Sequence, residues 1–557
     1  MHEFQDPGFG SSGYALPGYE NGRIMALVHA KGTMLYSLKD VNGATETFEE
    51  AVLISVGRDV KNVRHLVRRI QAVLATPEAT NGSHVMQRSS SKQPLLLAPE
   101  KARQTARLVF SGNGELPGLS LVPRGPSRRA ANQTTSNSLL SLAKIFQDAI
   151  SNGGAGSSLL QRPPGVGDIL ALYYLSLALQ ESPSTANNVG ILLAGVQPGL
   201  AGQSGQSLDL SGYPAVPGVP PGSGLALALA YYQYGLRLDP KHVHLHTNLG
   251  SLLKDIGLLD LAIQMYEQAV SCDGTFDIAL TNLANAVKDK GRIQDAITYY
   301  KRAVNSNTDF AEAVCGLFTA LNSVCDWRGR GGVLLGAGKY DQWHVDEAGM
   351  LLNSHAQQHP TGLAKRVAGI VTNQLDEASQ WGINILQIHT IATMSKQLDG
   401  LYEGERREFE GLLRNWAGKP WEGSRIMRLV ERASRVLQRR WYHERHPTRT
   451  TTTAAGEVLE RQQNLPDLRS RYRRPRLPAN LTVPPAPTVL PFHTFTCPLE
   501  PGDIRAISQR NAARISCSTL RSSWLPDHLY PPPPPPSPHL NVGYVSSDFN
   551  NHPLAHL

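Results

Sequence analysis

Residues 242–307 decide the fold, and they read HVHLHTNLGSLLKDIGLLDLAIQMYEQAVSCDGTFDIALTNLANAVKDKGRIQDAITYYKRAVNSN. The segment contains the same helical pattern twice, with a period of 34 residues. In each copy a glycine separates two amphipathic halves, first Gly257 and then Gly291. The matched positions are Asn248 with Asn282, Leu249 with Leu283, Leu252 with Ala286, Leu253 with Val287, Gly257 with Gly291, Ala262 with Ala296, Tyr266 with Tyr300 and Ala269 with Ala303.

This period is typical of the tetratricopeptide repeat, in which two amphipathic helices form a pair. Gly257 lets the chain leave the first helix through a left-handed turn. Ala262 lets the two helices approach closely, and Tyr266 fills the volume between repeats. Because one pair cannot bury its apolar face alone, further pairs must stack on it. The sequence therefore predicts a mainly α-helical solenoid with more repeats on either side.

Composition limits the other possibilities. The chain has 557 residues, 41% of them hydrophobic, but also 50 Gly and 38 Pro, which predicts ordered blocks separated by disordered ones. The five cysteines lack metal-ligand spacing, so we expect reduced structural thiols and no bound metal. The N-terminus has no signal-peptide pattern, and no apolar run reaches the roughly 18 residues that a membrane span needs. We expect a soluble intracellular protein with no membrane partner.

The net charge of +8 comes from one block, residues 425–476, which contains 14 Arg and 5 acidic residues. A basic block is a candidate contact for nucleic acid. Aromatic residues are sparse in it, however, and its first half predicts an amphipathic helix with arginines along one face. We therefore favour a solvated connector, and nucleic acid is the less favoured partner.

Outside the matched repeats the pattern weakens. The spacing of the second helix returns at Ala44 and Phe48, and Asn188 begins another copy whose partner helix follows an insertion of about 26 residues, which a surface loop tolerates. Helical stretches are predicted around 363–380, 394–416 and 424–443. The predicted organisation is a disordered start at 1–23, a tetratricopeptide-like pair at 24–75, a low-complexity linker at 76–137, repeats at 138–327 with insertions at 152–167 and 197–223, a Gly-rich insertion and helical connector at 328–445, an Arg/Pro-rich linker at 446–487 and the start of an α/β lobe at 488–557.

The last residues change pattern. Residues 540–545 form a short apolar run between Pro and Ser-Ser-Asp, which predicts a buried strand. His552-Pro553 then opens an expected helix with Pro at its first position. Ligands collect where such strands end. His552 is thus either a candidate general base or only a helix cap.

Residues 540–557, LNVGYVSSDFNNHPLAHL, closely resemble the opening of the catalytic region of protein O-linked N-acetylglucosaminyltransferases. Repeats that end in Cys325-Asp326-Trp327, and the segments 490–499 and 507–511, are similar to other parts of that family, and 421–425 is similar to its filamentous-fungal branch. The resemblance implies an enzyme of the nucleus and cytoplasm that transfers N-acetylglucosamine from UDP-N-acetylglucosamine to Ser or Thr of proteins with inversion. It also implies two Rossmann-like lobes and no metal or other cofactor.

The resemblance also implies roles for particular residues. It places His552 and His556 in the active site, and it places Asn188, Asn248 and Asn282 on a concave repeat surface, where they clamp the backbone of a substrate peptide. An amide suits this task because it donates to a carbonyl and accepts from an N–H without reading sequence. The alternative is that each asparagine only satisfies its own helix surface. The next repeat has Gly316 at this position, so we expect the row to stop there.

The family's sugar-nucleotide pocket lies beyond the position that matches His556, so we expect these 557 residues to lack a donor site and to transfer no sugar alone. Two explanations remain open. The chain is either a truncated portion of a fungal-type transferase, with repeats that recruit protein substrates, or a non-catalytic adaptor that binds peptides. Repeats of this kind also offer a route to homo-oligomers.

Overall fold

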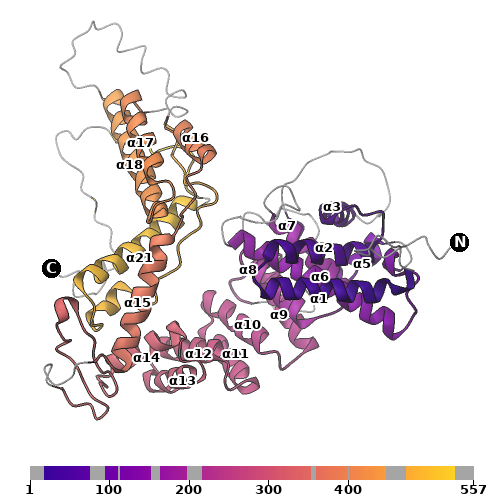
Figure 1. Ribbon diagram of the computed structural model, residues 1–557, viewed down its shortest axis with the longest axis horizontal. Coiled ribbons are helices and arrows are strands. Elements are labelled where there is room, and N and C mark those ends of the chain that lie inside the picture. The colour runs from indigo at the N-terminus through magenta and orange to yellow at the C-terminus, as the bar shows by residue number, and fades with distance from the viewer. Residues whose placement is uncertain are drawn as a thin grey trace, which may run out of the picture. The chain divides into compact units, whose positions relative to one another are not determined.

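The computed structural model describes residues 18–75, 94–110, 113–151, 164–196, 216–352, 359–398, 401–446, 472–522, 524–533 and 543. The chain divides into two compact units, and we describe each by itself. Unit 1 comprises residues 1–370 and 492–500, and unit 2 comprises 371–491 and 501–557. The regular structure of the described residues is helical apart from isolated β-bridges (Figure 1). The predicted mainly α-helical fold is confirmed.

Unit 1 is a stack of helical pairs, in which α1 packs on α2, α6 on α7, α8 on α9, α10 on α11 and α12 on α13. Contacts of α2 with α6, α7 with α8, α9 with α10 and α11 with α12 join the pairs, and α14 packs on α12 and α13. The expected further repeats are therefore present. The bounds are α1 (Asn21–Ser37), α2 (Val41–Val56), α6 (Pro126–Ser151), α7 (Val166–Leu179), α8 (Pro183–Ala194), α9 (Gly224–Leu238), α10 (Val243–Asp255), α11 (Leu259–Cys272), α12 (Asp277–Asp289), α13 (Ile293–Ser306) and α14 (Ala311–Ser323).

The turn inside each pair follows from the local sequence. Gly257 and Gly291 have φ angles of 87° and 80°, as their positions predict. In the first pair the equivalent residue is Lys39, with φ of 64°. Asp40 follows it, and its Oδ1 accepts the N–H of Gly43 at 3.0 Å, which caps α2. The first pair thus makes the left-handed turn without the glycine that adopts it at least cost.

Aromatic rings of the second helices pack on glycines of the first helices. A Cβ at Gly250 would lie 2.7 Å from Cε1 of Tyr266, so only glycine fits beneath the ring. Tyr266 therefore fills space inside its own pair rather than between repeats, whereas Tyr300 also reaches Gly316 of the next helix. The glycine–ring combinations inside pairs are Gly32 with Phe48, Gly190 with Tyr232 and Gly250 with Tyr266.

The connection from α2 to α6 is a folded insertion. It contains α3 (Val63–Leu74), α4 (Pro99–Ala102), α5 (Thr105–Val109) and η2 (Pro117–Leu119). The predicted low-complexity linker at 76–137 is therefore wrong for its described residues, since α6 already begins at Pro126. Phe110 and Leu119 are each only 1% exposed. A few such apolar residues anchor the insertion although the surrounding composition is polar.

After α14, residues 328–352 and 359–361 of unit 1 form a small cap, which includes η4 (Gly336–Gly338). Isolated β-bridges join Gly331 to Val345 and Leu334 to Tyr340. Within the cap, Arg330 donates to Asp341 at 2.6 Å, and the two side chains are 5% and 3% exposed. We call residues 328–352 and 359–361 the end cap, because they follow the last repeat helix in place of a second helix.

Unit 2 contains α16 (Ile388–Lys396), α17 (Glu403–Trp416), α18 (Glu422–Arg445) and α21 (Pro501–Arg521), and the two units divide within α15 (Gly362–Gln380). Its apolar core includes Phe409, Leu437 and Trp441, whose ring stacks on Tyr472 at 5.1 Å. The predicted helices at 363–380 and 424–443 are α15 and α18. The stretch at 394–416 was predicted as one helix, but it contains the end of α16 and all of α17.

The arginines of α18 are largely engaged within unit 2. Arg432 pairs with Glu408 at 3.0 Å, and Arg435 pairs with Glu431 at 3.8 Å. Arg432 also lies over the ring of Phe409, at 5.2 Å from its centroid. These contacts favour the connector over a nucleic-acid contact, because paired arginines offer less charge to phosphates.

The strand and the helix predicted at the end of 488–557 lie outside the described residues. This applies to the strand at 540–545 apart from Gly543, and to the helix opened by His552. The described part of 488–557 contains η5 (Pro491–Phe495) and α21. Among the residues that the structure describes, we find no helix with the length and hydropathy of a membrane span.

Candidate peptide-binding surface

The predicted asparagines lie on α8, α10 and α12, the first helices of successive pairs. We call the surface formed by these helices and by α14, the next first helix, the first-helix face. Asn188, Asn248 and Asn282 occupy equivalent positions on α8, α10 and α12 and are all half-buried. Each asparagine side chain is thus partly packed against neighbouring residues but remains partly accessible to solvent. This half-buried state suits a side chain that must bind a peptide backbone.

The structure joins α8 to α10 through an asparagine that the sequence analysis missed. Asn248 donates from Nδ2 to Oδ1 of Asn187 at 2.8 Å, and Asn187 is 8% exposed. The hydroxyl of Tyr173 on α7 donates to Oε1 of Gln147 at 2.9 Å. Burial and then Asp148 raise the pKa of Tyr173, and Asn188 acts in the opposite direction. The sequence signal for this contact was that Asn187 and Asn188 are adjacent, so that α8 has two amides available for contacts with its neighbours α7 and α10.

Asn282 differs from the other two predicted residues. Its amide makes no hydrogen bond to another residue in the described part of the chain. On the same helices, Lys254 of α10 pairs with Asp289 of α12 at 2.9 Å, which ties the two first helices together. An open amide between braced helices can donate and accept at once, so Asn282 offers a complete contact to one peptide group.

The row of asparagines stops at α14 for a steric reason. A Cβ on Gly316 would lie 2.4 Å from Cε1 of Tyr300, so no larger residue fits there without displacing the ring. The Tyr300 hydroxyl donates to Oδ1 of Asn285 at 2.5 Å, and Lys288 lies over the ring at 5.9 Å. Burial lowers the pKa of Lys288, although Asp289 acts against this. The predicted interruption therefore has a packing cause.

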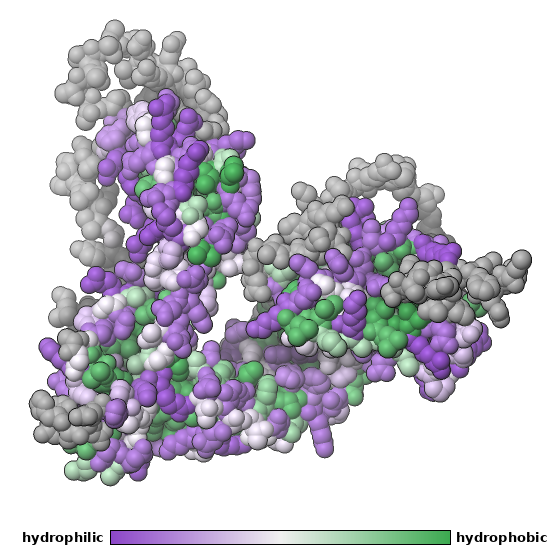
Figure 2. Space-filling view, viewed as in Figure 1, coloured by the Kyte–Doolittle hydropathy of each residue, from purple (hydrophilic) through white to green (hydrophobic). Residues whose placement is uncertain are grey.

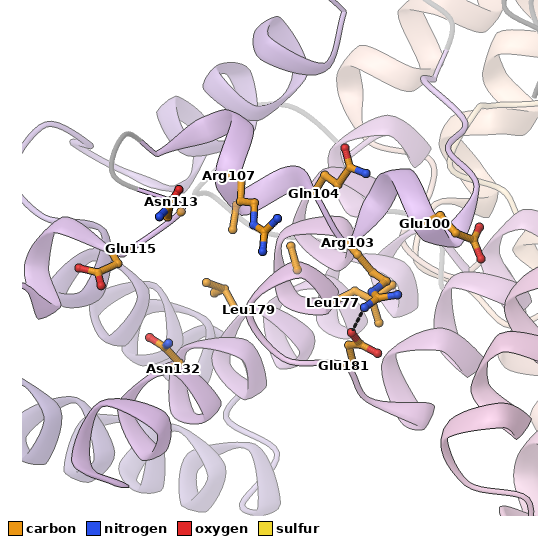
Figure 3. A pocket seen from close by; sticks show the side chains of 13 residues that line it. Glu100, Arg103, Gln104, Arg107, Asn113, Glu115, Asn132, Leu177, Leu179 and Glu181 are labelled. Atoms are coloured by element: carbon orange, nitrogen blue, oxygen red, sulfur yellow. Dashed lines mark ion pairs between the residues drawn. The ribbon is translucent and has the colours of Figure 1, made fainter. Parts of the chain in front are cut away.

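Unit 1 also has a cavity of about 530 Å³, lined mainly by residues of α4, α5, α6 and α7 (Figure 3). Its wall carries charges of both signs, and Arg103 pairs with Glu181 at 2.5 Å across one side. The side chain of Arg107, on α5, is among those that line the cavity in Figure 3. None of the predicted site residues lines this cavity, and we assign it no function.

The predicted catalytic residues His552 and His556 lie outside the described residues. Among the residues that the structure describes, no group of three or more His, Cys, Asp or Glu side chains is arranged to hold a metal ion. The five cysteines include no disulfide, and burial raises the pKa of Cys315 and of Cys497 to about 12.

These features define a protein with tetratricopeptide repeats. The tetratricopeptide repeat family model matches residues 243–275 and 278–310, which correspond to α10 with α11 and α12 with α13. Solved structures that are similar in part include two of MamA and one of a TPR2AB-domain:pHSP90 complex of yeast Sti1. The MamA matches are 30% and 17% identical, cover 18% and 33% of this chain and 60% and 84% of theirs, and have TM-scores of 0.18 and 0.22. The Sti1 match is 14% identical over 52% of this chain and 94% of that one, with a TM-score of 0.15.

Among curated proteins, the chain is similar to the probable UDP-N-acetylglucosamine–peptide N-acetylglucosaminyltransferase SEC of Arabidopsis thaliana. The identity is 40% over 77 residues, which is 13% of this chain. The match covers only 8% of that protein's length.

Proposed function

We propose that the first-helix face binds extended peptide segments of partner proteins, and that the chain is the substrate-recruiting portion of a protein O-GlcNAc transferase. The row of asparagines carries the peptide-binding proposal. Its supporting observation is that Asn248 is fixed by Asn187 while the Asn282 amide meets no described partner. Tetratricopeptide repeats support a protein-binding role independently.

Sequence similarity supports the transferase part of the proposal. Residues 540–557 resemble the opening of that family's catalytic region, and the 77 residues similar to the Arabidopsis protein are 40% identical. The donor would be UDP-N-acetylglucosamine, the acceptors Ser or Thr of proteins in the nucleus and cytoplasm, and His552 and His556 would lie in the active site. Because of its insertions, we assign the chain within this proposal to the filamentous-fungal branch of the family.

Peptide binding is tested by changing Asn248 and Asn282 together to Ala. Fluorescence anisotropy with an uncharged, labelled Ser/Thr/Pro-rich peptide of about 20 residues should show a loss of about tenfold or more, since each backbone hydrogen bond contributes about 1 kcal/mol. A matched control changes the exposed amides of Gln264 and Gln268 on α11 to Ala and should leave affinity unchanged.

The thermal midpoint of the Asn248→Ala/Asn282→Ala variant should stay close to that of the wild type. Lost folding with lost binding would show that the amides are structural and would overturn the proposal. The transferase part is measured on the protein isolated from its own cells, by transfer of labelled N-acetylglucosamine to a Ser/Thr peptide. Transfer no greater than that of a heat-denatured sample would contradict it.

Homo-oligomerisation through the repeats belongs to the same proposal. Hydrophobic patches lie over the N-terminal pair in Figure 2. Leu27 and Met34 of α1 are 73% and 64% exposed, and Leu38, which follows α1, is 71% exposed. Light scattering would measure the mass of the chain in solution. Changing Leu27 and Leu38 to Ser should reduce any self-association, and an unchanged dimer mass would exclude α1 as the interface.

A further inference from the structure

Unit 2 contains a cavity of about 460 Å³ between α15, α18 and α21, and Pro484 and Pro485 form part of its wall. This volume lies within the range of pockets that hold small molecules. Trp381, directly after α15, and Trp421, directly before α18, also line the cavity. The cavity thus combines the size of a ligand pocket with two large aromatic side chains.

The ring of Trp381 is held in one position. Its Nε1 donates to the carbonyl of Thr482 at 3.0 Å. A Cβ on Gly423 would lie 2.9 Å from Cε3 of Trp381, so the ring packs directly on the backbone at the start of α18. Because the one N–H of the indole is already bonded, Trp381 offers a ligand only an apolar surface.

Trp421 has an unusual backbone conformation. Its φ of 69° and ψ of 18° lie in the left-handed region, which is costly for a bulky side chain. The N–H of Trp421 donates to the carbonyl of Ser379 at 2.6 Å, which helps to fix this conformation. The side chain is still 39% exposed, so a ring is kept at a strained position without being buried by the protein. Strained positions of this kind are common at ligand-binding sites.

The charged residues around the cavity carry an excess of positive charge. They are three arginines and two glutamates, namely Arg425, Arg428, Arg510, Glu377 and Glu431. Glu431 is already paired with Arg435, which lies outside the lining, at 3.8 Å. Arg510 is buried and donates to the carbonyls of Gln374 and Pro485, so its guanidinium is fixed within the wall.

Arg425 and Arg428 supply the cationic groups that remain open to a ligand. They lie three residues apart on α18 and therefore share one face of the helix. Arg425 is half-buried, with its guanidinium 6.0 Å from the centroid of the Trp416 ring, and Arg428 is exposed. Within the described ranges of the chain, neither arginine forms an ion pair. Two such guanidinium groups beside an aromatic cavity suit a ligand that brings an acidic group.

We propose that this cavity binds a small aromatic carboxylic acid, whose ring contacts Trp381 and Trp421 and whose carboxylate binds to Arg425 and Arg428. Aromatic side chains favour another ring in offset-stacked or edge-to-face contact. A guanidinium binds a carboxylate through two parallel N–H bonds, which fixes the orientation of the ligand as well as its charge. The site lies in unit 2 and does not depend on the peptide binding proposed for unit 1.

The test uses the whole chain, with 2-naphthoate as the probe and 2-naphthamide as its uncharged analogue. Isothermal titration calorimetry should give a Kd of about 0.1 mM for naphthoate and about tenfold weaker binding of the amide, because the amide lacks the charge-assisted hydrogen bonds. Arg428→Gln should weaken naphthoate binding about tenfold and leave the amide unchanged. The matched control Arg439→Gln removes an exposed arginine of α18 that does not line the cavity, and it should change neither affinity.

A second variant, Trp421→Asn, removes the ring while Asn tolerates the left-handed conformation and can cap α18. It should weaken the binding of both probes about tenfold, with a thermal midpoint close to that of the wild type. Full naphthoate affinity in this variant would place the binding elsewhere and overturn the proposal.

Two further results would also overturn it. One is the absence of naphthoate binding to the wild type at about 1 mM, ten times the expected Kd. The other is an equal loss of affinity in Arg428→Gln and Arg439→Gln, which would indicate a general attraction of anions to the basic helix. Because both arginines are exposed, this comparison decides the proposal even if Trp421→Asn does not fold.

Discussion

Lys39 shows how a single residue can keep a repeat's geometry while losing its sequence signature. It lies at the turn position of Gly257 and Gly291 and shares their positive φ. An L-residue in this conformation costs about 1–2 kcal/mol relative to a right-handed one, a cost that glycine largely avoids. The first pair therefore carries strain at a position where the matched repeats carry none.

Replacing Lys39 with Gly should raise the free energy of unfolding by about 1 kcal/mol. The substitution removes the backbone strain, but part of this gain is offset because glycine loses more conformational entropy on folding. Urea unfolding followed by circular dichroism measures the change. The converse substitution, Gly257→Ala, serves as the control and should lower stability by a similar amount, since an added Cβ there meets nothing within 4 Å and only the backbone is strained. An unchanged midpoint for Lys39→Gly would argue that the turn is unstrained.

Asn248 illustrates what the repeat pattern predicts and what it does not. The period fixed its position on the first helix, because equivalent residues of stacked pairs occupy equivalent places. It did not predict the hydrogen bond to Asn187. That residue lies on α8, whose own partner helix follows only after a long insertion, and α8 has two adjacent amides, Asn187 and Asn188, that could accept the bond. Register between neighbouring pairs depends on side-chain packing that a single sequence does not display.

At the scale of elements, α1 is held to its neighbours partly through His29. Its Nδ1 lies 2.9 Å from Ser138 Oγ on α6, and its ring packs at 5.3 Å from that of Phe48 on α2. Burial lowers the pKa of His29. Three helices of the N-terminal part therefore meet at one titratable side chain whose neutral form is favoured in the folded state.

This arrangement predicts acid sensitivity with a defined sign. Because the folded pKa of His29 lies below its unfolded value of about 6.5, its contribution is present above that pH and is lost as the pH falls below it. The variant His29→Gln can still hydrogen-bond Ser138 but does not titrate. Between pH 7.5 and 5, we expect the wild type to lose more unfolding free energy than the variant. Parallel losses in urea titrations at both pH values would contradict the assignment.

At the scale of the whole molecule, periodicity predicted the stack of helical pairs, and composition mispredicted the described part of the connection between α2 and α6. The repeats were found because each pair repeats the same spacing, from Ala44 to Ala303. The insertion between α2 and α6 was missed because its order depends on isolated residues such as Phe110, which bury against distant helices and leave no periodic trace. The chemistry expected of His552 and His556 lies outside the described residues and stays a prediction.

A stack of repeats is most vulnerable at its ends, because each pair is stabilised mainly by its neighbours. The end cap after α14 contains the buried pair of Arg330 with Asp341, and Arg330 also donates to the carbonyl of Trp343 at 2.6 Å. Removing one partner of a buried pair leaves the other charge uncompensated, which typically costs about 3–5 kcal/mol. The pair is therefore a sensitive point for the end of the array.

Asp341→Ala should consequently open the end of the stack before its middle. Hydrogen exchange followed by mass spectrometry should show α14 losing protection strongly while α10 and α11 change little, since coupling in a stack passes only between neighbours. The double variant Arg330→Met/Asp341→Leu removes both charges and should restore most of the protection, because no unpaired charge remains. Equal loss of protection in α10 and α14 would mean that unit 1 unfolds as one cooperative block, and the end cap would then stabilise every repeat rather than the last one alone.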